Sequence, residues 1–255
     1  MKREEKEVMI SEEVRVGGQL NTADASMAVP AISIIVPVYN EEASISSVLK
    51  LLLEVNWASN TVEIIIVDDG STDGTANEVA AFVALPFIKV VQHAQNMGKG
   101  AALKTGFKRA IGTVIVVQDA DMEYLPGCIP DLVKPILENK ADIVFGSRFK
   151  GNCKGMSLSH YIGNKILSLT ARILYEAPIT DIMTGSKAFR RSVIEGVDLK
   201  ERGFGVEVEL TSKSLQMNSR YFEIPIEYNH RTAGESKIRP SDGFKSLFQL
   251  FSNAL

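Results

Sequence analysis

The chain has 255 residues, of which 45% are hydrophobic and 23% charged, an ordinary balance for one large globular domain or two small ones. Its net charge of -3 argues against a general nucleic-acid-binding protein, because such proteins carry a strongly basic face. The two cysteines, Cys128 and Cys153, lack the spacing of a metal site or a disulfide framework, so we expect reduced thiols in a cytosolic compartment.

Residues 1–30 show no steady hydrophobic period and predict a disordered leader that ends at Pro30. The charged start is not followed by an apolar stretch, so it lacks the pattern of a secretory signal. No run of about 18 apolar residues occurs in the sequence, which argues against a membrane-spanning helix. Order is expected to begin at Ala31.

Short β-branched runs then alternate with helical patterns. Strands are predicted at residues 32–38, 62–67, 88–91, 114–117 and 143–145. Helices are predicted after Asn40 and Asp73, each as an N-cap, with Val83 on the buried face of the second, and over residues 101–110. This alternation predicts an α/β fold with a Rossmann-like, mostly parallel sheet covered by helices on both faces. Ligands in such sheets bind outside the carboxyl ends of the strands.

The sequence changes character after Gly151. Residues 158–175 predict a long amphipathic helix, and residues 221–228 predict a strand that Pro225 places at a sheet edge or a bulge. We expect the main domain to span residues 31–240 and an amphipathic helix to occupy residues 241–255. Both helices can pack on the core, which is the commoner case, or lie against a membrane surface.

The first two predicted strands end in polar segments. Tyr39 follows the first strand and can either stack on a nucleobase or cap the core. Asp68 and Asp69 end the second strand, where carboxylates can accept hydrogen bonds from a base or a ribose. Asp73 lies in a Gly- and Ser-rich turn and is interpreted as a turn residue. We therefore assign Asp69 to function.

Residues 96–100 open the third predicted helix with glycines that allow close approach to an anion and with Lys99, which adds positive charge. The segment does not match the Walker pattern. No Gly-x-Gly-x-x-Gly follows the first strand, which counts against a dinucleotide oxidoreductase.

The fourth predicted strand ends in the strongest signal, Asp119 and Asp121. Residues two apart in an extended chain point the same way, and two close carboxylates repel unless a cation lies between them. Oxygen ligands without His or Cys suit Mg²⁺ or Mn²⁺, and Glu123 continues the alternation as a candidate third ligand. The alternative of two solvated loop acids is disfavoured by the apolar strand before them.

These four segments, in this order, resemble the family-2 glycosyltransferases, whose fold is called GT-A, over about residues 31–250. The resemblance implies a nucleotide-sugar donor and a metal, bound by Asp119 and Asp121, that bridges its two phosphates. The donor-binding residues that it implies are, in chain order, Pro37, Tyr39, Glu41, Asp69, Lys99 and Asp119.

Later segments look like the polyprenyl-phosphate sugar transferases of the dolichyl-phosphate mannose synthase type. These are residues 146–148, 181–191, 203–209, 224–226 and 231–238. The likeness implies that Arg148, Arg231 and Lys237, with Ser236 beside the last, bind phosphates. Met122 and Glu123 stand where many members have Leu and Gln, and Asp181 is the candidate base if the acceptor is a hydroxyl.

The sequence thus predicts an inverting transfer of mannose or glucose from a GDP- or UDP-sugar to a polyprenyl phosphate such as dolichyl or undecaprenyl phosphate. Asp119, Asp121, Arg148 and Asp181 are the candidate catalytic residues. The enzyme would act peripherally on the cytoplasmic face of a membrane, on the lipid surface or on a membrane partner protein. One alternative is a family-2 transferase to a hydroxyl of a polysaccharide, lipid or protein. Another is an inactive nucleotide-binding scaffold.

Overall fold

The computed structural model describes residues 30–153, 155–203, 205–229 and 240–254. Its strands are β1 (Ile32–Val38), β2 (Val62–Asp68), β3 (Ile88–Gln92), β4 (Val114–Val117), β5 (Ile143–Asn152), β6 (Lys187–Arg190) and β7 (Tyr221–Glu227). Its helices are α1 (Ile45–Glu54), α2 (Thr75–Ala80), α3 (Lys99–Arg109), α4 (Ile129–Leu137), α5 (Leu158–Leu174), α6 (Arg191–Glu195), α7 (Val206–Gln216) and α8 (Pro240–Ala254).

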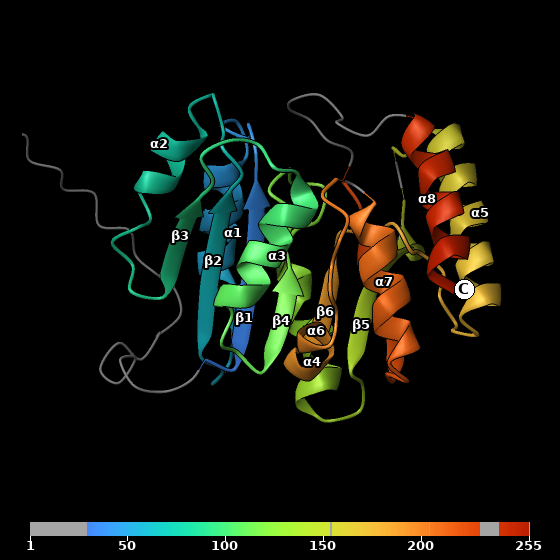
Figure 1. The fold of residues 1–255 in the computed structure, drawn as a ribbon. Coiled ribbons are helices and arrows are strands. Elements are labelled where there is room, and N and C mark those ends of the chain that lie inside the picture. The colour runs from blue at the N-terminus through green and yellow to red at the C-terminus, as the bar shows by residue number, and fades with distance from the viewer. Residues whose placement is uncertain (1–29, 154, 204, 230–239, 255) are drawn as a thin grey trace, which may run out of the picture.

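The strands form one sheet in the order β3-β2-β1-β4-β6-β5-β7 (Figure 1). Neighbouring strands run parallel except at β6, which is antiparallel to both β4 and β5. One core lies between the sheet and α1, α2 and α4, and a second lies between the other face and α3, α6 and α7. The predicted α/β fold, a mostly parallel sheet with helices on both faces, is confirmed.

The hydrophobic pattern accounts for the central layer. All seven residues of β1 and all four of β4 are buried, as expected for β-branched strands covered on both sides. The apolar residues of α1, spaced three and four apart, are buried against the first core. β7 is the last strand of the described sheet, so Pro225 lies on an edge strand as predicted.

Some element boundaries differ from the predictions. α1 begins at Ile45 with Ser44 at its N-cap position, whereas Asn40 lies four residues earlier with a positive φ of 50°. α2 ends at Ala80, and Val83, predicted on its buried face, is exposed. β6, α4, α6 and α7 were not predicted.

α5 and α8 pack side by side at one end of the sheet, and α8 also contacts α7 (Figure 1). Leu250 of α8 is fully buried and joins the second core. No helix in the described ranges has the length and apolar character needed to cross a membrane. The predicted leader lies outside the described residues except for Pro30.

Candidate active site

The carboxyl ends of β1, β2 and β4 lie together at one edge of the sheet. β1 pairs in parallel with both other strands, and the register places Val38 opposite Asp68 and Ile35 opposite Val117. Residues one or two positions past the ends of these strands therefore gather at the same edge. Tyr39, Asp69 and Asp119 are among them, as the sequence pattern predicted for ligand-binding positions.

Asp69 joins the end of β2 to the loop before α3. Its buried carboxylate accepts hydrogen bonds from the backbone N–H of Met97 (3.0 Å) and of Gly98 (2.7 Å). It also lies 2.6 Å from Nδ1 of His93, whose Nε2 is 2.9 Å from the Thr105 hydroxyl. Sequence reasoning missed His93, because a single histidine after a short strand carries no local signal.

Hydrogen bonds connect the turn after β1 to the turn after β2. Asn40 donates its N–H to the Ser71 hydroxyl at 3.0 Å, and its side-chain oxygen accepts from the N–H of Thr72 at 2.8 Å. The N–H of Glu41 donates to the Thr75 hydroxyl at 2.8 Å. These bonds hold the partly buried Tyr39 and the buried Glu41 beside the second strand end.

Asp119, two residues after the end of β4, forms an ion pair with a lysine. The ammonium of Lys99, the first residue of α3, lies 2.6 Å from Asp119 Oδ1 and 2.8 Å from Glu207 Oε1. Gly185 packs against the other oxygen, since a Cβ at Gly185 would collide with Asp119 Oδ2. The structure therefore joins Lys99 and Asp119, two predicted donor-site residues, in one partly buried ion pair.

Glu207 extends this pair into a chain of four charges. Glu207 lies in the first turn of α7, and its Oε2 pairs with the ammonium of Lys187, a fully buried residue at the start of β6. Lys187 also lies 5.1 Å from the centre of the Phe145 ring. Sequence reasoning gave neither Lys187 nor Glu207 a role, although a lysine inside a short buried strand is an unusual residue that could have drawn attention.

These four charged side chains change one another's pKa values. Burial raises the pKa of Asp119 to about 6, with Asp121 and Glu207 adding to the rise and Lys99 opposing it. Burial would also raise the pKa of Glu207, but Lys187 and Lys99 outweigh it and lower the value to about 2. A further cation beside Asp119 would oppose the rise in its pKa.

The fit of a divalent ion rests on Asp119 and Asp121. Two repelling carboxylates are the oxygen donors that Mg²⁺ and Mn²⁺ prefer. The chain turns at Met122, whose φ is 63°, and Glu123 Oε1 accepts a hydrogen bond from the Tyr228 hydroxyl at 3.3 Å. Within the described ranges no three acidic, His or Cys side chains form a metal-binding group, so Glu123 is not clustered with the other two. The two aspartates fit the ion, and further ligands would come from the donor or from water.

Arg148 and Asp181, both predicted catalytic residues, are bound to each other. The guanidinium donates from Nε and Nη2 to the two carboxylate oxygens, each at 2.7 Å, and the backbone N–H of Arg148 adds a third bond at 3.1 Å. Asp181 is fully buried, and Arg148 lies 6.0 and 5.7 Å from the ring centres of Tyr124 and Tyr228. Both Asp181 oxygens are therefore engaged by a cation.

Glu223 of β7 fixes the loop that carries Asp181. Its buried carboxylate accepts from the N–H of Thr180 at 2.7 Å and from the Tyr221 hydroxyl at 2.6 Å. Lys150 adds an ion pair at 3.1 Å. The predicted phosphate-binding residues Arg231, Ser236 and Lys237 lie outside the described residues.

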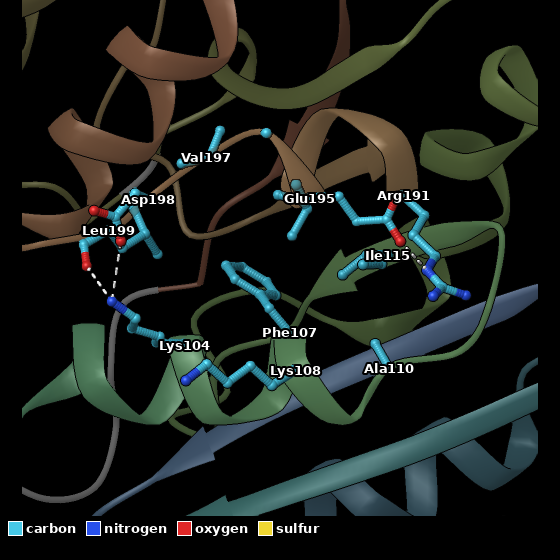
Figure 2. A pocket seen from close by; sticks show the side chains of 12 residues that line it. Lys104, Phe107, Lys108, Ala110, Ile115, Arg191, Glu195, Val197, Asp198 and Leu199 are labelled. Carbon is cyan, nitrogen blue, oxygen red and sulfur yellow. Dashed lines mark hydrogen bonds and ion pairs between the residues drawn. The ribbon is translucent and has the colours of Figure 1, made fainter.

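A separate pocket of about 440 Å³ opens between α3 and the segment from α6 to Leu199 (Figure 2). At its mouth the ammonium of Lys104 reaches Asp198 at 3.2 Å and the carbonyl of Leu199 at 2.9 Å. None of the predicted site residues lines this pocket. The contacts at its mouth instead fasten the segment before α7 to α3, which keeps Glu207 next to Lys99.

The strand-end acids and the Lys99–Asp119 ion pair lie together at the carboxyl edge of the sheet. Residues 33–197 match the family described as Glycosyl transferase family 2, and the chain belongs to this family.

Curated relatives share about 30% sequence identity. A dolichol-phosphate mannosyltransferase of Pyrococcus furiosus is 31% identical over 226 residues, which are 86% of this chain and 62% of that protein. A polyprenol monophosphomannose synthase of Mycolicibacterium smegmatis is 30% identical over 229 residues, which are 85% of this chain and 84% of that protein. The chain thus spans less than two thirds of the length of the first relative.

Solved structures share the fold. Glucosyl-3-phosphoglycerate synthase of Mycobacterium tuberculosis, in complex with phosphoglyceric acid, superposes with a TM-score of 0.70 at 23% identity, covering 88% of this chain and 80% of that one. The same enzyme in complex with Mn²⁺, UDP and glucosyl-3-phosphoglycerate gives a TM-score of 0.64 at 22% identity, covering 88% and 78%. The likeness establishes a GT-A-like fold.

Proposed function

We propose that this chain transfers a hexose, mannose or glucose, from a GDP- or UDP-sugar to a polyprenyl phosphate with inversion. The observation that carries the proposal is the partly buried Lys99–Asp119 pair beside Asp121, at the sheet edge where Asp69 and Tyr39 also lie. The choice of acceptor is supported by the two relatives, whose names specify a dolichol-phosphate and a polyprenol-phosphate product.

In this proposal the donor lies along the carboxyl edge. Tyr39, Glu41 and Asp69 contact the nucleoside, with Pro37 shaping the end of β1, and Lys99 faces the diphosphate. Asp119 and Asp121 would hold Mg²⁺ or Mn²⁺, which when bound neutralises charge on the leaving nucleoside diphosphate. The M. tuberculosis enzyme binds Mn²⁺ together with UDP, which supports this assignment.

The acceptor phosphate is already an anion and needs positive charge to bring it near the donor rather than a general base. An oxygen of the lipid phosphate attacks the anomeric carbon from the face opposite the leaving nucleoside diphosphate. Arg148, oriented by its bidentate bonds to Asp181, is the described cation proposed to hold that phosphate, with Arg231, Ser236 and Lys237 as further candidates.

Transfer to a hydroxyl would require Asp181 to accept a proton. Its full burial and its two bonds to Arg148 disfavour that role, because protonation would leave a buried guanidinium without its counter-ion. The proposal therefore favours a phosphate acceptor over a hydroxyl acceptor. Metal-independent nucleotide binding, or none, would instead support the inactive scaffold.

An apolar face on α5 and α8 supports the proposed location on a membrane surface. It consists of exposed side chains, each between 49% and 77% accessible: Leu158, Ile162, Ile166, Leu169, Ile173, Phe248 and Phe251. We expect vesicles to bind the protein and a variant with Ile166→Ser and Leu169→Ser to bind less. Val83→Ser, at an exposed apolar residue elsewhere, is the matched control. Equal sedimentation of all three proteins with and without vesicles would contradict this part.

The decisive experiment is a donor screen with GDP-mannose and UDP-glucose, each with dolichyl or undecaprenyl phosphate, with and without Mn²⁺. A product with the mass of a polyprenyl-phosphate hexose, formed only with metal, is expected. Asp119→Asn serves as the inactive control. Transfer only to hydroxyl acceptors, or metal-independent turnover, would overturn the proposal.

A further inference from the structure

Lys99 forms an ion pair with the carboxylate of Asp119, which is a metal ligand in the proposed function. Its ammonium lies 2.6 Å from Asp119 Oδ1, inside the distance at which a divalent ion would compete for the same oxygen. Gly185 packs against the other oxygen. A cation that binds Asp119 must therefore share the carboxylate with Lys99 or displace it.

Glu207 gives Lys99 a second counter-ion. The Lys99 side chain is 16% exposed and that of Glu207 is 6% exposed, so both have little contact with bulk water. A buried ammonium that loses its only carboxylate carries a large desolvation penalty. Because Glu207 Oε1 lies 2.8 Å from the ammonium, Lys99 can give up Asp119 and still keep an ion pair.

Lys187 is the second cation that pairs with the Glu207 carboxylate. It pairs with Oε2 while Lys99 pairs with Oε1, so each ammonium holds one oxygen of the same carboxylate. Lys187 is fully buried, and among the described residues its ion pair is with Glu207. Its presence weakens the attraction of Glu207 for Lys99, and its removal would leave Glu207 to Lys99 alone.

We propose that Glu207 and Lys187 are positioning residues that set how firmly Lys99 covers Asp119, and thereby set the affinity of the site for a divalent cation. This inference rests on the proposed function, in which Asp119 is a metal ligand. Glu207 draws Lys99 away from Asp119 and favours the ion. Lys187 opposes Glu207 and disfavours the ion.

The two residues therefore have opposite expected effects. Glu207→Gln leaves Lys99 with Asp119 as its sole carboxylate, and Mn²⁺ affinity should fall by roughly 10–100-fold, as for other residues that act through a metal ligand. Lys187→Met, which keeps the length of the side chain, should raise Mn²⁺ affinity by up to about tenfold. A residue that only supports folding would shift affinity downwards in both cases.

The measurement is Mn²⁺ binding by the full chain without donor. Calorimetry and the loss of the free-ion electron spin resonance signal both report it. Binding of UDP and GDP at saturating Mn²⁺ is the second readout and should change less than Mn²⁺ binding. Glu195→Gln and Lys213→Met, partners of exposed or partly exposed ion pairs on α6 and α7, are the matched controls. Both should bind Mn²⁺ as the wild type does.

The double variant Lys187→Met with Glu207→Gln keeps the test decisive if Glu207→Gln alone fails to fold, because it removes one charge of each sign from the cluster. It should bind Mn²⁺ as weakly as Glu207→Gln, since Lys187 acts only through Glu207. Affinity changes of the same sign in the two single variants, or a double variant with wild-type affinity, overturn the inference alone. Wild-type protein that binds no Mn²⁺, or Asp119→Asn with unchanged affinity, overturns the proposed function as well.

Discussion

The acids of the candidate site are held in different ways in two parts of the molecule, the described residues up to 98 and those from 99 onward, called here the N-terminal and the C-terminal half. In the N-terminal half, Asp68 and Asp69 accept hydrogen bonds from backbone N–H groups and polar side chains, among them Ser71 N–H at 2.9 Å and Gln92 Nε2 at 3.1 Å for Asp68. In the C-terminal half, Asp119 and Asp181 pair with Lys99 and Arg148. Turns support the first kind of site, and long-range ion pairs support the second.

This difference has an energetic consequence. A lost hydrogen bond from a backbone amide can be partly replaced by an asparagine oxygen, whereas a buried cation without its carboxylate stays uncompensated. The same Asp→Asn change should therefore cost more free energy of unfolding in the C-terminal half than in the N-terminal half.

The largest effect is expected for Asp181→Asn. It leaves the Arg148 guanidinium buried without a counter-ion and should lower the free energy of unfolding by about 3–5 kcal/mol. Asp68→Asn, the matched change in the other half, should cost only about 1–2 kcal/mol. Urea unfolding followed by circular dichroism measures both, and equal losses would remove the distinction between the halves.

Asp119→Asn should act on catalysis more than on folding. It keeps the shape of the side chain but removes the charge proposed to hold the metal, and we expect kcat/KM to fall by roughly 10²–10³-fold, a loss typical for a group that stabilises transition-state charge. Initial rates at several Mn²⁺ concentrations measure it. Asp73→Asn, in the turn before α2, is the control and should keep most activity. Recovery of Asp119→Asn to wild-type rates would contradict the assignment.

Much of the site could be predicted because strand ends are visible in the sequence. Tyr39, Asp69 and Asp119 follow uninterrupted β-branched runs, and parallel pairing of those runs brings them to one edge. The antiparallel strand β6 could not be predicted, because its four residues, Lys187 to Arg190, carry no alternation.

The ion pairs were unpredictable for the same reason. Arg148 and Asp181 are 33 residues apart, and Lys99 and Glu207 lie on different helices, so their pairing depends on the order of strands and on how the segment before α7 returns to α3. The family resemblance assigned Arg148 to phosphate binding, and Asp181 was the candidate base for a hydroxyl acceptor, whereas the fold makes them partners.

Gly98 lies where the two halves meet. Its φ is 95°, and a Cβ would collide with the carbonyl of Arg202 in the segment before α7. Gly98→Ala should therefore lower the free energy of unfolding by about 1–3 kcal/mol. Gly163→Ala in α5, where a Cβ meets nothing within 4 Å, should instead raise it by roughly 0.4–1 kcal/mol. Thermal unfolding of both variants compares them, and a stabilising Gly98→Ala would show that the halves can separate at this contact.

The smallest effect tests whether burial, rather than position in the C-terminal half, makes an ion pair important. Asp142 lies in that half but is partly exposed, and its hydrogen bonds to Arg220, followed by those to Arg190, hold its pKa well below the usual range. A folded-state pKa below the unfolded value contributes stability above about pH 4 that is lost as the pH falls further. Asp142→Asn should cost only about 0.5–1 kcal/mol near pH 7, because solvent and salt screen the pair.

That cost should shrink as the pH is lowered from 5 towards 3, since the wild-type advantage disappears while the variant has no carboxyl to protonate. Urea unfolding at pH 3, 5 and 7, with and without added salt, follows the difference between the two proteins. A loss at pH 7 as large as that of Asp181→Asn would mean that position in the C-terminal half, and not burial, sets the strength of these pairs. A small, salt-sensitive loss would mean that the two halves differ because the C-terminal half buries its charges.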